Sequence, residues 1–275
     1  MKTQRVIKRD ATYQKFEVLK SNRNKRHRYG EFFVEGVRNI NHLISEGWTV
    51  NSFLYSGEAK LSDWARDILK AVPTKVNYEL TDELMAELSG KTDASELMAI
   101  VQMRPNDPAQ IRPGKNPLLV LFDRPSNRGN LGTIIRSIDA LGLDGLVVTG
   151  HSVDLYDPET IVASMGSFFK VPSVRIEDNQ SIREWIQGLK AKHPGFQVVG
   201  TSAHAECSLF DADLTAPTLL LIGNETDGLS RKLAEISDRM VKIPMSSSSS
   251  ASSLNVACAA SILFYEAIRQ RKGTL

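Results

Sequence analysis

Three turns in the second half of the chain carry side chains that could take part in chemistry. In the first, DRPSNRGNLGTIIRS at residues 123–137, glycines flank Asn130, a candidate helix cap, and Arg136 follows six residues later. An arginine fixed on a helix can hold a phosphate through two parallel hydrogen bonds. The turn therefore offers an anion-binding group beside an accessible backbone, although a tight turn followed by a surface arginine would read the same.

The second turn, LLLIGNETDGLS at residues 219–230, follows an apolar run. Its Gly-Asn-Glu sequence places the side chains of Asn224 and Glu225 at the end of an expected strand. Glycines on either side let the backbone approach a ligand closely. A turn leading into a helix capped by Ser230 would have the same composition.

The third turn, IPMSSSSSASSLN at residues 243–255, is the low-complexity tract of the chain. Every residue from Ser246 to Ser253 except Ala251 is serine. Ser252 or Ser253 is expected to cap the helix that follows, whose first N–H groups could meet an acceptor. The tract is either a plain linker or a backbone that closes around a ligand.

The elements that must position these turns alternate between strands and helices. Strands are expected at 118–122, 145–149, 197–200, 218–222 and 240–243, and helices at 131–141, 158–164, 181–190, 230–236 and 255–271. This alternation predicts an α/β fold with a mostly parallel sheet covered by helices on both faces. Ligands of such sheets bind beyond the carboxyl ends of the strands, which is where the three turns fall.

The first half of the chain predicts a small separate α/β unit. Its strands are expected at 32–35, 52–55 and 96–103, and its helices at 37–46, at 61–71 and after the capping residue Thr81. Four prolines within residues 104–117 indicate a connector. The expected division is therefore an N-terminal domain at 1–103, a linker at 104–117 and a C-terminal domain at 118–275.

Composition and charge narrow the class of protein. The 275 residues are 41% hydrophobic and 24% charged, which is ordinary for a globular protein. Two cysteines, strand-sized apolar runs and no apolar signal core favour the cytoplasm. Residues 1–30 carry a net charge of +8. Because the whole chain carries +2, the other residues together carry −6. Such a basic segment indicates a nucleic-acid partner or a solvated, partly frayed helix.

Motifs of other enzyme classes are missing. The sequence has no dinucleotide-binding glycine fingerprint, no phosphate loop ending in Gly-Lys-Ser or Gly-Lys-Thr, and no HExxH zinc motif. The nucleophile-elbow pattern is also missing. His204 and Cys207 are three residues apart, but no third orienting group accompanies them, which is weak support for a nucleophilic pair.

Taken in order, the motifs resemble those of one enzyme family. NLGTIIRS, IGNETDGLS and IPM followed by SSLN are similar to motifs one, two and three of the SpoU (TrmH-type) RNA ribose 2′-O-methyltransferases of the SPOUT superfamily. The intervening DLYDPETIVASMGSFFKVP and GTSAHAECSLFDADL also resemble that family, so the similarity covers residues 118–271. GEFFVEGVRNI, within residues 13–46, resembles the N-terminal RNA substrate-binding domain of many members.

The resemblance implies a C-terminal domain with a deep trefoil knot, which would be an exception to the rule against knots. It also implies S-adenosyl-L-methionine as cofactor, RNA as substrate with ribosomal RNA favoured over transfer RNA, and a homodimer built through the knotted domain. The serine tract would be the knot loop that closes around the cofactor. The implied cofactor-binding residues are Thr201, Gly223, Ile243 and Leu254. The implied catalytic residues are Arg136, Asn130, Glu225, Ser253 and Asn255.

Three departures from the family pattern are visible. Arg128 replaces a proline before Asn130, the segment between Ile243 and Asn255 is about two residues longer than usual, and Ala257 replaces a serine. The longer loop bears on the contact assigned to Leu254. Two alternatives stay open: a transfer RNA methyltransferase, and a non-catalytic RNA-binding protein whose methyltransferase fold has decayed.

Overall fold

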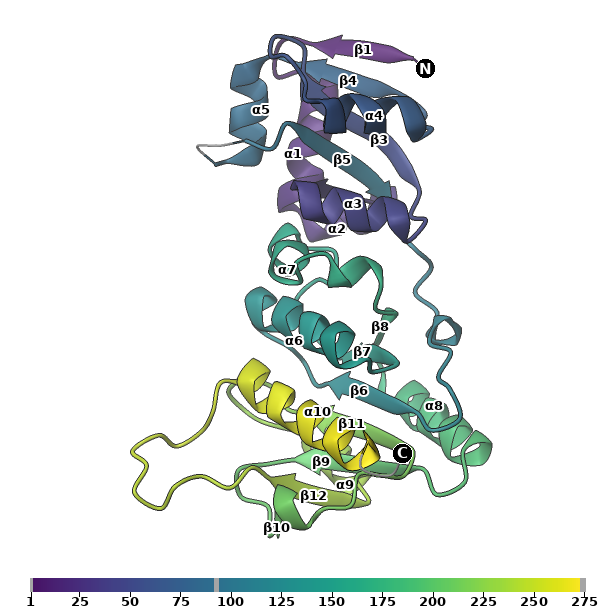
Figure 1. Ribbon diagram of the computed structural model, residues 1–275, viewed down its shortest axis with the longest axis vertical. Helices are drawn as coiled ribbons and strands as arrows, with labels where there is room; N and C mark the ends of the chain where they lie inside the picture. Colours follow the sequence, from purple (N-terminus) through teal and green to yellow (C-terminus); the bar gives the residue numbers. More distant parts are fainter. Residues whose placement is uncertain (1, 92–93, 273–275) are drawn as a thin grey trace. The chain divides into compact units, whose positions relative to one another are not determined.

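The computed structural model describes residues 2–91 and 94–272, and the chain divides into two compact units. The first unit contains the residues up to Pro105 together with Asp154–Lys170. The second contains Asn106–Val153 and the residues from Val171 onwards. Each unit is built around its own sheet (Figure 1).

The sheet of the first unit has five strands in the order β1-β4-β3-β5-β2. The strands are β1 (Thr3–Val6), β2 (Glu31–Glu35), β3 (Val50–Ser56), β4 (Asn77–Leu80) and β5 (Leu97–Gln102). The helices are α1 (Ala11–Ser21), α2 (Arg23–Tyr29), α3 (Val37–Ser45), α4 (Asp63–Ala71), α5 (Asp82–Ser89) and α7 (Pro158–Ala163). As predicted, Thr81 caps α5 by accepting a hydrogen bond from the backbone N–H of Leu84.

The basic N-terminal segment is folded into this unit. Asp10 caps α1 by accepting from the backbone N–H groups of Thr12 and Tyr13. Tyr13, Phe16 and Leu19 repeat at helical spacing and are buried in the core against β5 and α5. The alternative of a partly frayed helix is therefore wrong. The same segment is basic on its surface and apolar on its inner face.

A segment from the second half of the chain packs onto this first unit. The guanidinium of Arg26 on α2 is buried, and its Nε lies 2.8 Å from a carboxylate oxygen of Asp154. The indole N–H of Trp48 donates to the carbonyl of Phe169 at 2.8 Å, and Phe168 also contacts the indole ring. The domain boundaries drawn from the sequence stay a prediction, and the contacts add Asp154–Lys170 to the N-terminal unit.

The sheet of the second unit confirms the predicted parallel arrangement. Its order is β10-β12-β9-β11-β6-β7-β8, and all of its pairings are parallel. The strands are β6 (Leu118–Phe122), β7 (Gly145–Thr149), β8 (Ser173–Ile176), β9 (Gln197–Thr201), β10 (Cys207–Ser208), β11 (Thr218–Ile222) and β12 (Arg239–Lys242). β6 and β11 are buried along their whole length, as central parallel strands are.

Helices pack on this sheet through alternating strand residues. Leu119, Leu121 and the matching residues of β11 share a core with α8 (Asn179–Lys192) and α9 (Arg231–Glu235). Successive strand residues point to opposite faces, so Val120 and Phe122 point to the other face. α6 (Arg128–Leu141) and α10 (Val256–Lys272) contact each other and run side by side in Figure 1.

The proline-rich stretch after residue 103 is not a free tether beyond Pro105. Ile111 is buried in the core of the second unit. The side-chain amide of Asn106 donates to the carbonyl of Arg175 at 2.8 Å and accepts from the backbone N–H of Arg175 at 2.8 Å, so it imitates the pairing of a neighbouring strand. Three prolines restrict the backbone here, which favours a fixed course over the sheet edge. Within the described ranges, no helix is long and apolar enough to cross a membrane.

The buried Arg26 predicts a large loss of stability when it is removed. Arg26→Ala leaves the buried Asp154 carboxylate without its guanidinium partner, and breaking a buried ion pair costs about 3–5 kcal/mol of unfolding free energy. Arg28→Ala is the matched control, because Arg28 lies on the same helix and is exposed. Urea denaturation measures both. An equal effect of the two substitutions would contradict the role of Arg26.

The same pair makes stability depend on pH in a defined direction. Burial acts to raise the pKa of Asp154, but hydrogen bonding from His27 and the charge of Arg26 outweigh it, so the pKa lies below its ordinary value. The contribution is therefore complete above about pH 4 and is lost as the pH falls through the lowered pKa. Arg26→Ala should flatten the acid limb of the stability curve.

Candidate active site

Three of the four residues assigned to the cofactor lie at neighbouring strand ends. Thr201 ends β9, Gly223 follows β11 and Ile243 follows β12. β9 lies between β11 and β12 in the sheet, and Thr201 is in register with Val241. Parallel pairing brings all three carboxyl ends to one edge, where ligands of such sheets bind.

Gly223 is needed where it stands because the chain folds back over it. A Cβ there would lie 2.5 Å from the carbonyl carbon of Gly228 and 2.5 Å from the backbone nitrogen of Leu229. Both are backbone atoms, which cannot swing aside as a long side chain could. The sequence predicted that the backbone comes close to a ligand at Gly223. The structure shows that the backbone of Gly228 and Leu229 already lies close enough to require a glycine here.

The residues after Gly223 form a closed loop, called here the glutamate loop, at residues 224–228. The backbones of Asn224 and Gly228 exchange two hydrogen bonds, of 3.0 and 3.1 Å. The side-chain oxygen of Asn224 accepts from the N–H groups of Thr226 and Asp227. These bonds satisfy the loop from within and leave Glu225 projecting from it.

The Glu225 carboxylate binds the beginning of α6. It accepts from the backbone N–H and the hydroxyl of Ser126, at 2.9 and 2.8 Å, and from the N–H of Asn127 at 3.0 Å. Burial acts to raise the pKa of Glu225, but these hydrogen bonds outweigh it and hold the pKa below its ordinary value. Glu225 is therefore an ionised anchor and a weak base.

A directional chain of amides extends from this carboxylate. The Asn130 amide nitrogen donates to Glu225 at 3.4 Å, and its oxygen accepts from the Asn255 amide nitrogen at 3.2 Å. A carboxylate can only accept, so it fixes the orientation of the Asn130 amide and hence that of Asn255. The structure thus brings together Asn130, Glu225 and Asn255, three of the five residues assigned to catalysis.

The helix caps differ from the sequence prediction at two places. Asn127 caps α6 by accepting from the N–H of Asn130, so Asn130 is the third residue of the helix and is not its cap. Asn255 caps α10 by accepting from the N–H groups of Ala257 and Cys258. The prediction that Ser252 or Ser253 caps this helix is wrong, because the asparagine adjacent to the helix has the required geometry.

Arg136 lies further along α6 and is exposed. Six residues rotate the helix by about 240°, so its side chain leaves α6 on a different side from Asn130. Within residues 2–91 and 94–272 its guanidinium makes no ion pair or hydrogen bond. Ser137 beside it hydrogen-bonds Ser261 on α10 at 2.8 Å, so Arg136 stands near the seam between the two helices.

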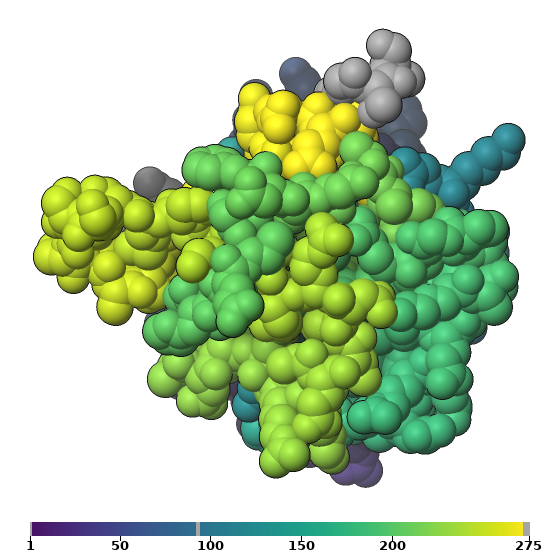
Figure 2. Space-filling model, turned by 90° about the horizontal axis from the view of Figure 1, so that it is seen from below, coloured from purple at the N-terminus to yellow at the C-terminus, as the bar shows by residue number. Residues whose placement is uncertain are grey.

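The serine tract lies in solvent. Residues 244–255 are all exposed, and Figures 1 and 2 show this segment projecting from the second unit. Its hydrogen bonds are local, such as that between the hydroxyls of Ser246 and Ser248 at 2.8 Å. Among the described residues, no hydrogen bond joins Ser253 or Leu254 to the other predicted site residues, although both directly precede Asn255. The loop expected to close around the cofactor is open in this structure.

Sequence reasoning missed two residues beneath the site, Asp123 and Arg124. Asp123 is buried and accepts from the Thr149 hydroxyl at 2.9 Å and the Ser230 N–H at 2.7 Å. The signal was present in the sequence, because a carboxylate directly after a buried strand must find partners at the sheet edge. The neighbouring proline made Asp-Arg-Pro resemble an ordinary turn.

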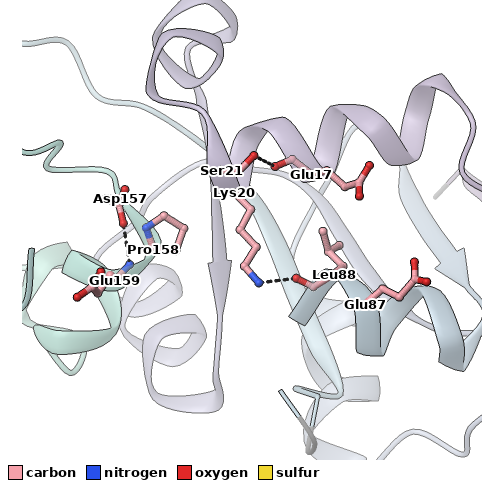
Figure 3. A pocket seen from close by; sticks show the side chains of 8 residues that line it. All are labelled: Glu17, Lys20, Ser21, Glu87, Leu88, Asp157, Pro158 and Glu159. Carbon is pink, nitrogen blue, oxygen red and sulfur yellow. Dashed lines mark hydrogen bonds between the residues drawn. The ribbon is translucent and has the colours of Figure 1, made fainter. Parts of the chain in front are cut away.

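A pocket in the first unit differs from this site in character. It has a volume of about 480 Å³, and four of its eight lining residues are acidic, with the Lys20 ammonium donating to the Leu88 carbonyl at the end of α5 (Figure 3). Its lining residues are Glu17, Lys20, Ser21, Glu87, Leu88, Asp157, Pro158 and Glu159. Carboxylates repel phosphate, so this pocket does not suit a nucleic-acid ligand.

Comparisons with known proteins match both units. The SpoU rRNA Methylase family matches residues 117–265, and the SpoU L30e-like domain matches residues 10–99. A curated relative, the 23S rRNA (uridine(2479)-2′-O)-methyltransferase of Streptomyces viridochromogenes, is 46% identical over 268 residues. That alignment covers 97% of this chain and 92% of the relative.

Solved structures agree with these matches. The crystal structure of the SpoU methyltransferase AviRb from Streptomyces viridochromogenes in complex with the cofactor AdoMet aligns with a TM-score of 0.91 at 46% identity, covering 96% of this chain and 99% of that one. An AdoMet-bound rRNA methyltransferase from Sinorhizobium meliloti aligns with a TM-score of 0.83 at 26% identity, covering 97% and 98%.

Replacing Glu225 by glutamine should destabilise the second unit. The amide offers an NH₂ group where the carboxylate accepted, so at least one donor among Ser126, Asn127 and Asn130 loses its acceptor. The expected loss of unfolding free energy is about 1–3 kcal/mol. Asp227→Asn makes the same charge change in the same loop at an exposed side chain, and should stay within about 0.5 kcal/mol. Thermal denaturation compares them, and equal shifts would refute the anchoring role.

Proposed function

The chain belongs to the SpoU rRNA Methylase family and is an S-adenosylmethionine-dependent RNA ribose 2′-O-methyltransferase, and we propose that its substrate is 23S rRNA. The first candidate nucleotide is the uridine equivalent to the one named for the Streptomyces viridochromogenes relative. Support comes from the length of that similarity, which includes the N-terminal unit as well as the catalytic unit. A transfer RNA substrate is the alternative outcome of the test below.

The observation that carries the catalytic assignment is the meeting of the three motifs. Asn130, Glu225 and Asn255 are separated by up to 125 residues in the sequence, yet they form one chain of hydrogen bonds. A decayed site that only binds RNA would have no reason to keep this arrangement. The intact network therefore favours an active enzyme over a non-catalytic RNA-binding protein.

The strand ends offer free backbone groups that suit the binding of the cofactor. Gly223 is buried, and within the described residues its backbone N–H and carbonyl make no hydrogen bond, so they are available to a ligand at this edge. Thr201 and Ile243 stand on the two neighbouring strands. These three residues would hold S-adenosylmethionine, and Leu254 would join them when the serine tract closes. The bound cofactor supplies an electrophilic methyl group on a sulfonium.

Arg136 is proposed to anchor the RNA phosphate next to the reacting ribose. Transfer to a 2′-hydroxyl is an in-line displacement, whose main demand is positioning. A guanidinium scarcely loses its proton in proteins, so Arg136 does not serve as the base. It binds the 3′ phosphate and stabilises the negative charge that develops on the ribose oxygen. Its lack of partners among the described residues leaves its hydrogen-bond donors available.

The amide chain is proposed to orient the ribose. In the described part of the chain, the Asn130 and Asn255 amide nitrogens each donate once, which leaves each a second N–H for the substrate. Glu225 does not compete as a base, because its oxygens already accept several hydrogen bonds and its pKa is lowered. Ser253 would reach the ribose only with the serine tract closed.

The first unit supplies a basic surface for the RNA. Some of its cations have internal partners, since Arg26 pairs with Asp154 and Lys20 caps α5. The side chains of Lys8, Lys25 and Arg28 have no partner among the described residues and remain for phosphate contacts. The number of phosphate contacts expected from this segment is therefore smaller than its net charge of +8 suggests.

A homodimer is proposed through α10. Ala257, Ala260, Leu263, Phe264 and Ala267 bury one side of this helix in the unit. The opposite side exposes Ile262 and Tyr265, with 42% and 62% of their surfaces accessible. An apolar stripe left on a helix that already has a buried side indicates a further contact. Here the partner would be a second copy of the chain.

The dimer predicts a change of mass on substitution. Ile262→Asp combined with Tyr265→Asp places charges in the interface and should give a monomer by sedimentation equilibrium. Ile7→Asp, at a more exposed apolar residue of the first unit, should leave the mass unchanged. A monomeric wild-type protein would contradict the proposal.

Two further expectations belong to this proposal. The C-terminal segment is expected to form the trefoil knot, and a crystallographic trace in which α10 passes through no loop would contradict it. The site of action is expected to be the cytoplasm, where ribosomal RNA is modified. Cell fractionation that places the methylation activity elsewhere would contradict this.

Loss of the gene should remove one 2′-O-methyl group from 23S rRNA, as read by mapping these groups across ribosomal and transfer RNA. Complementation with Arg136→Ala should fail to restore the mark, while the purified variant binds S-adenosylmethionine normally. Arg183→Ala, an exposed arginine on α8, should restore it. A mark lost only from transfer RNA would refute the substrate, and near-normal turnover by Arg136→Ala would refute the role of the arginine.

A further inference from the structure

Arg124, at the carboxyl end of β6, has a backbone conformation that arginine rarely adopts. Its φ is +48°, in the left-handed region that favours glycine. Asparagine or glycine would adopt this conformation at lower energy. Such strain persists where the surrounding structure requires it, and it gathers at functional sites. The contacts of Arg124 are therefore expected to require this conformation.

The guanidinium of Arg124 is held rigidly by Asp123. Its Nε and Nη2 atoms donate to the two oxygens of that carboxylate, each at 3.0 Å. Asp123 is itself buried and fixed by the Thr149 hydroxyl and the Ser230 N–H. This fork geometry is specific to arginine, because an ammonium cannot donate in two parallel directions.

The same residue holds the glutamate loop, residues 224–228, at both ends. The backbone carbonyl of Arg124 accepts from the Asn224 amide at 2.7 Å. Its Nη2 donates to the Gly228 carbonyl at 3.3 Å. Gly150 leaves the space for this course, since a Cβ there would lie 2.8 Å from the Cγ of Arg124. The strained backbone is what lets the carbonyl and the side chain reach one loop.

We propose that Arg124 is a positioning residue that sets the glutamate loop for S-adenosylmethionine. With Asn224 and Gly228 held, Glu225 reaches α6 and the backbone of Gly223 stays at the cofactor edge. Arg124 is not a second phosphate anchor, because its fork is occupied by Asp123 and Gly228. The inference rests on the proposed cofactor role of this edge, and it assigns a task to a residue outside the catalytic set.

Two substitutions in the full-length protein separate the backbone from the side chain. Arg124→Gly accepts the positive φ without strain and keeps the backbone carbonyl, but removes the whole side chain with its guanidinium. Arg124→Lys keeps the charge but cannot reach Asp123 and Gly228 together. Asp227→Asn is the matched control, because Asp227 is exposed and lies 3.8 Å from the same guanidinium. Calorimetry measures the S-adenosylmethionine Kd, and steady-state kinetics with 23S rRNA give kcat and both KM values.

Arg124→Gly should raise the Kd and the KM for S-adenosylmethionine by about tenfold or more, with the KM for RNA within about twofold of wild type. Arg124→Lys should give a Kd and a KM for S-adenosylmethionine between those of wild type and Arg124→Gly. Asp227→Asn should match wild type in both. An unchanged cofactor Kd in both Arg124 variants would overturn the proposal. So would a parallel rise of both KM values with a lowered Tm. Wild-type protein that binds no S-adenosylmethionine would instead refute the proposed function itself.

Discussion

The ionised carboxylate of Glu225 against the first turn of α6 is the interaction on which the site depends. It joins a loop after β11 to a turn after β6, and through Asn130 it reaches the cap of α10. Because a carboxylate has no proton to give at neutral pH, every bond in this chain has only one possible direction. A single charge thereby fixes two amides and the start of a helix.

The sheet makes this interaction possible because the carboxyl ends of β6 and β11 lie next to each other. β6 and β11 are paired in register along their whole length, from Leu118 opposite Thr218 to Phe122 opposite Ile222. Their loops must then leave the sheet side by side. Asp123 and Arg124 convert this nearness into fixed geometry, because a buried carboxylate in an apolar layer has to bind every donor within reach. The strain at Arg124 and the order of the glutamate loop are two results of the same constraint.

Strands were predictable where burial alone determines them. Leu118–Phe122 and Thr218–Ile222 are continuous apolar runs, and the structure has them with the predicted bounds. β1 and β8 were missed because they are short and partly exposed, so their pairing partners decide their conformation. The start of α6 was placed three residues late, since Arg-Gly-Asn in its first turn breaks the apolar period and only the cap at Asn127 marks it.

The motifs predicted that Asn130, Glu225 and Asn255 lie near one another, but not the hydrogen bonds that join them. Asn130, Glu225 and Asn255 stand in recognisable motifs, but their bonds span 95 and 125 residues, a separation that no local pattern encodes. The position of Asp123 directly after a buried strand indicated that it needs partners, but the partners of Asp123 and Arg124 depend on what the sheet places beside them.

The serine tract differs from the rest of the site because it is exposed and its hydrogen bonds are local. One end leaves β12 and the other is fixed at Asn255 by the amide chain, while residues 244–254 are exposed between them. Closing such a loop around a ligand costs backbone entropy in any sequence. Long polar side chains would add a further cost of about 1.5–2 kcal/mol each when ordered, which a serine largely avoids. A run of serines is therefore suited to the proposed closing of this loop around a ligand, because ordering serines costs less entropy than ordering long polar side chains.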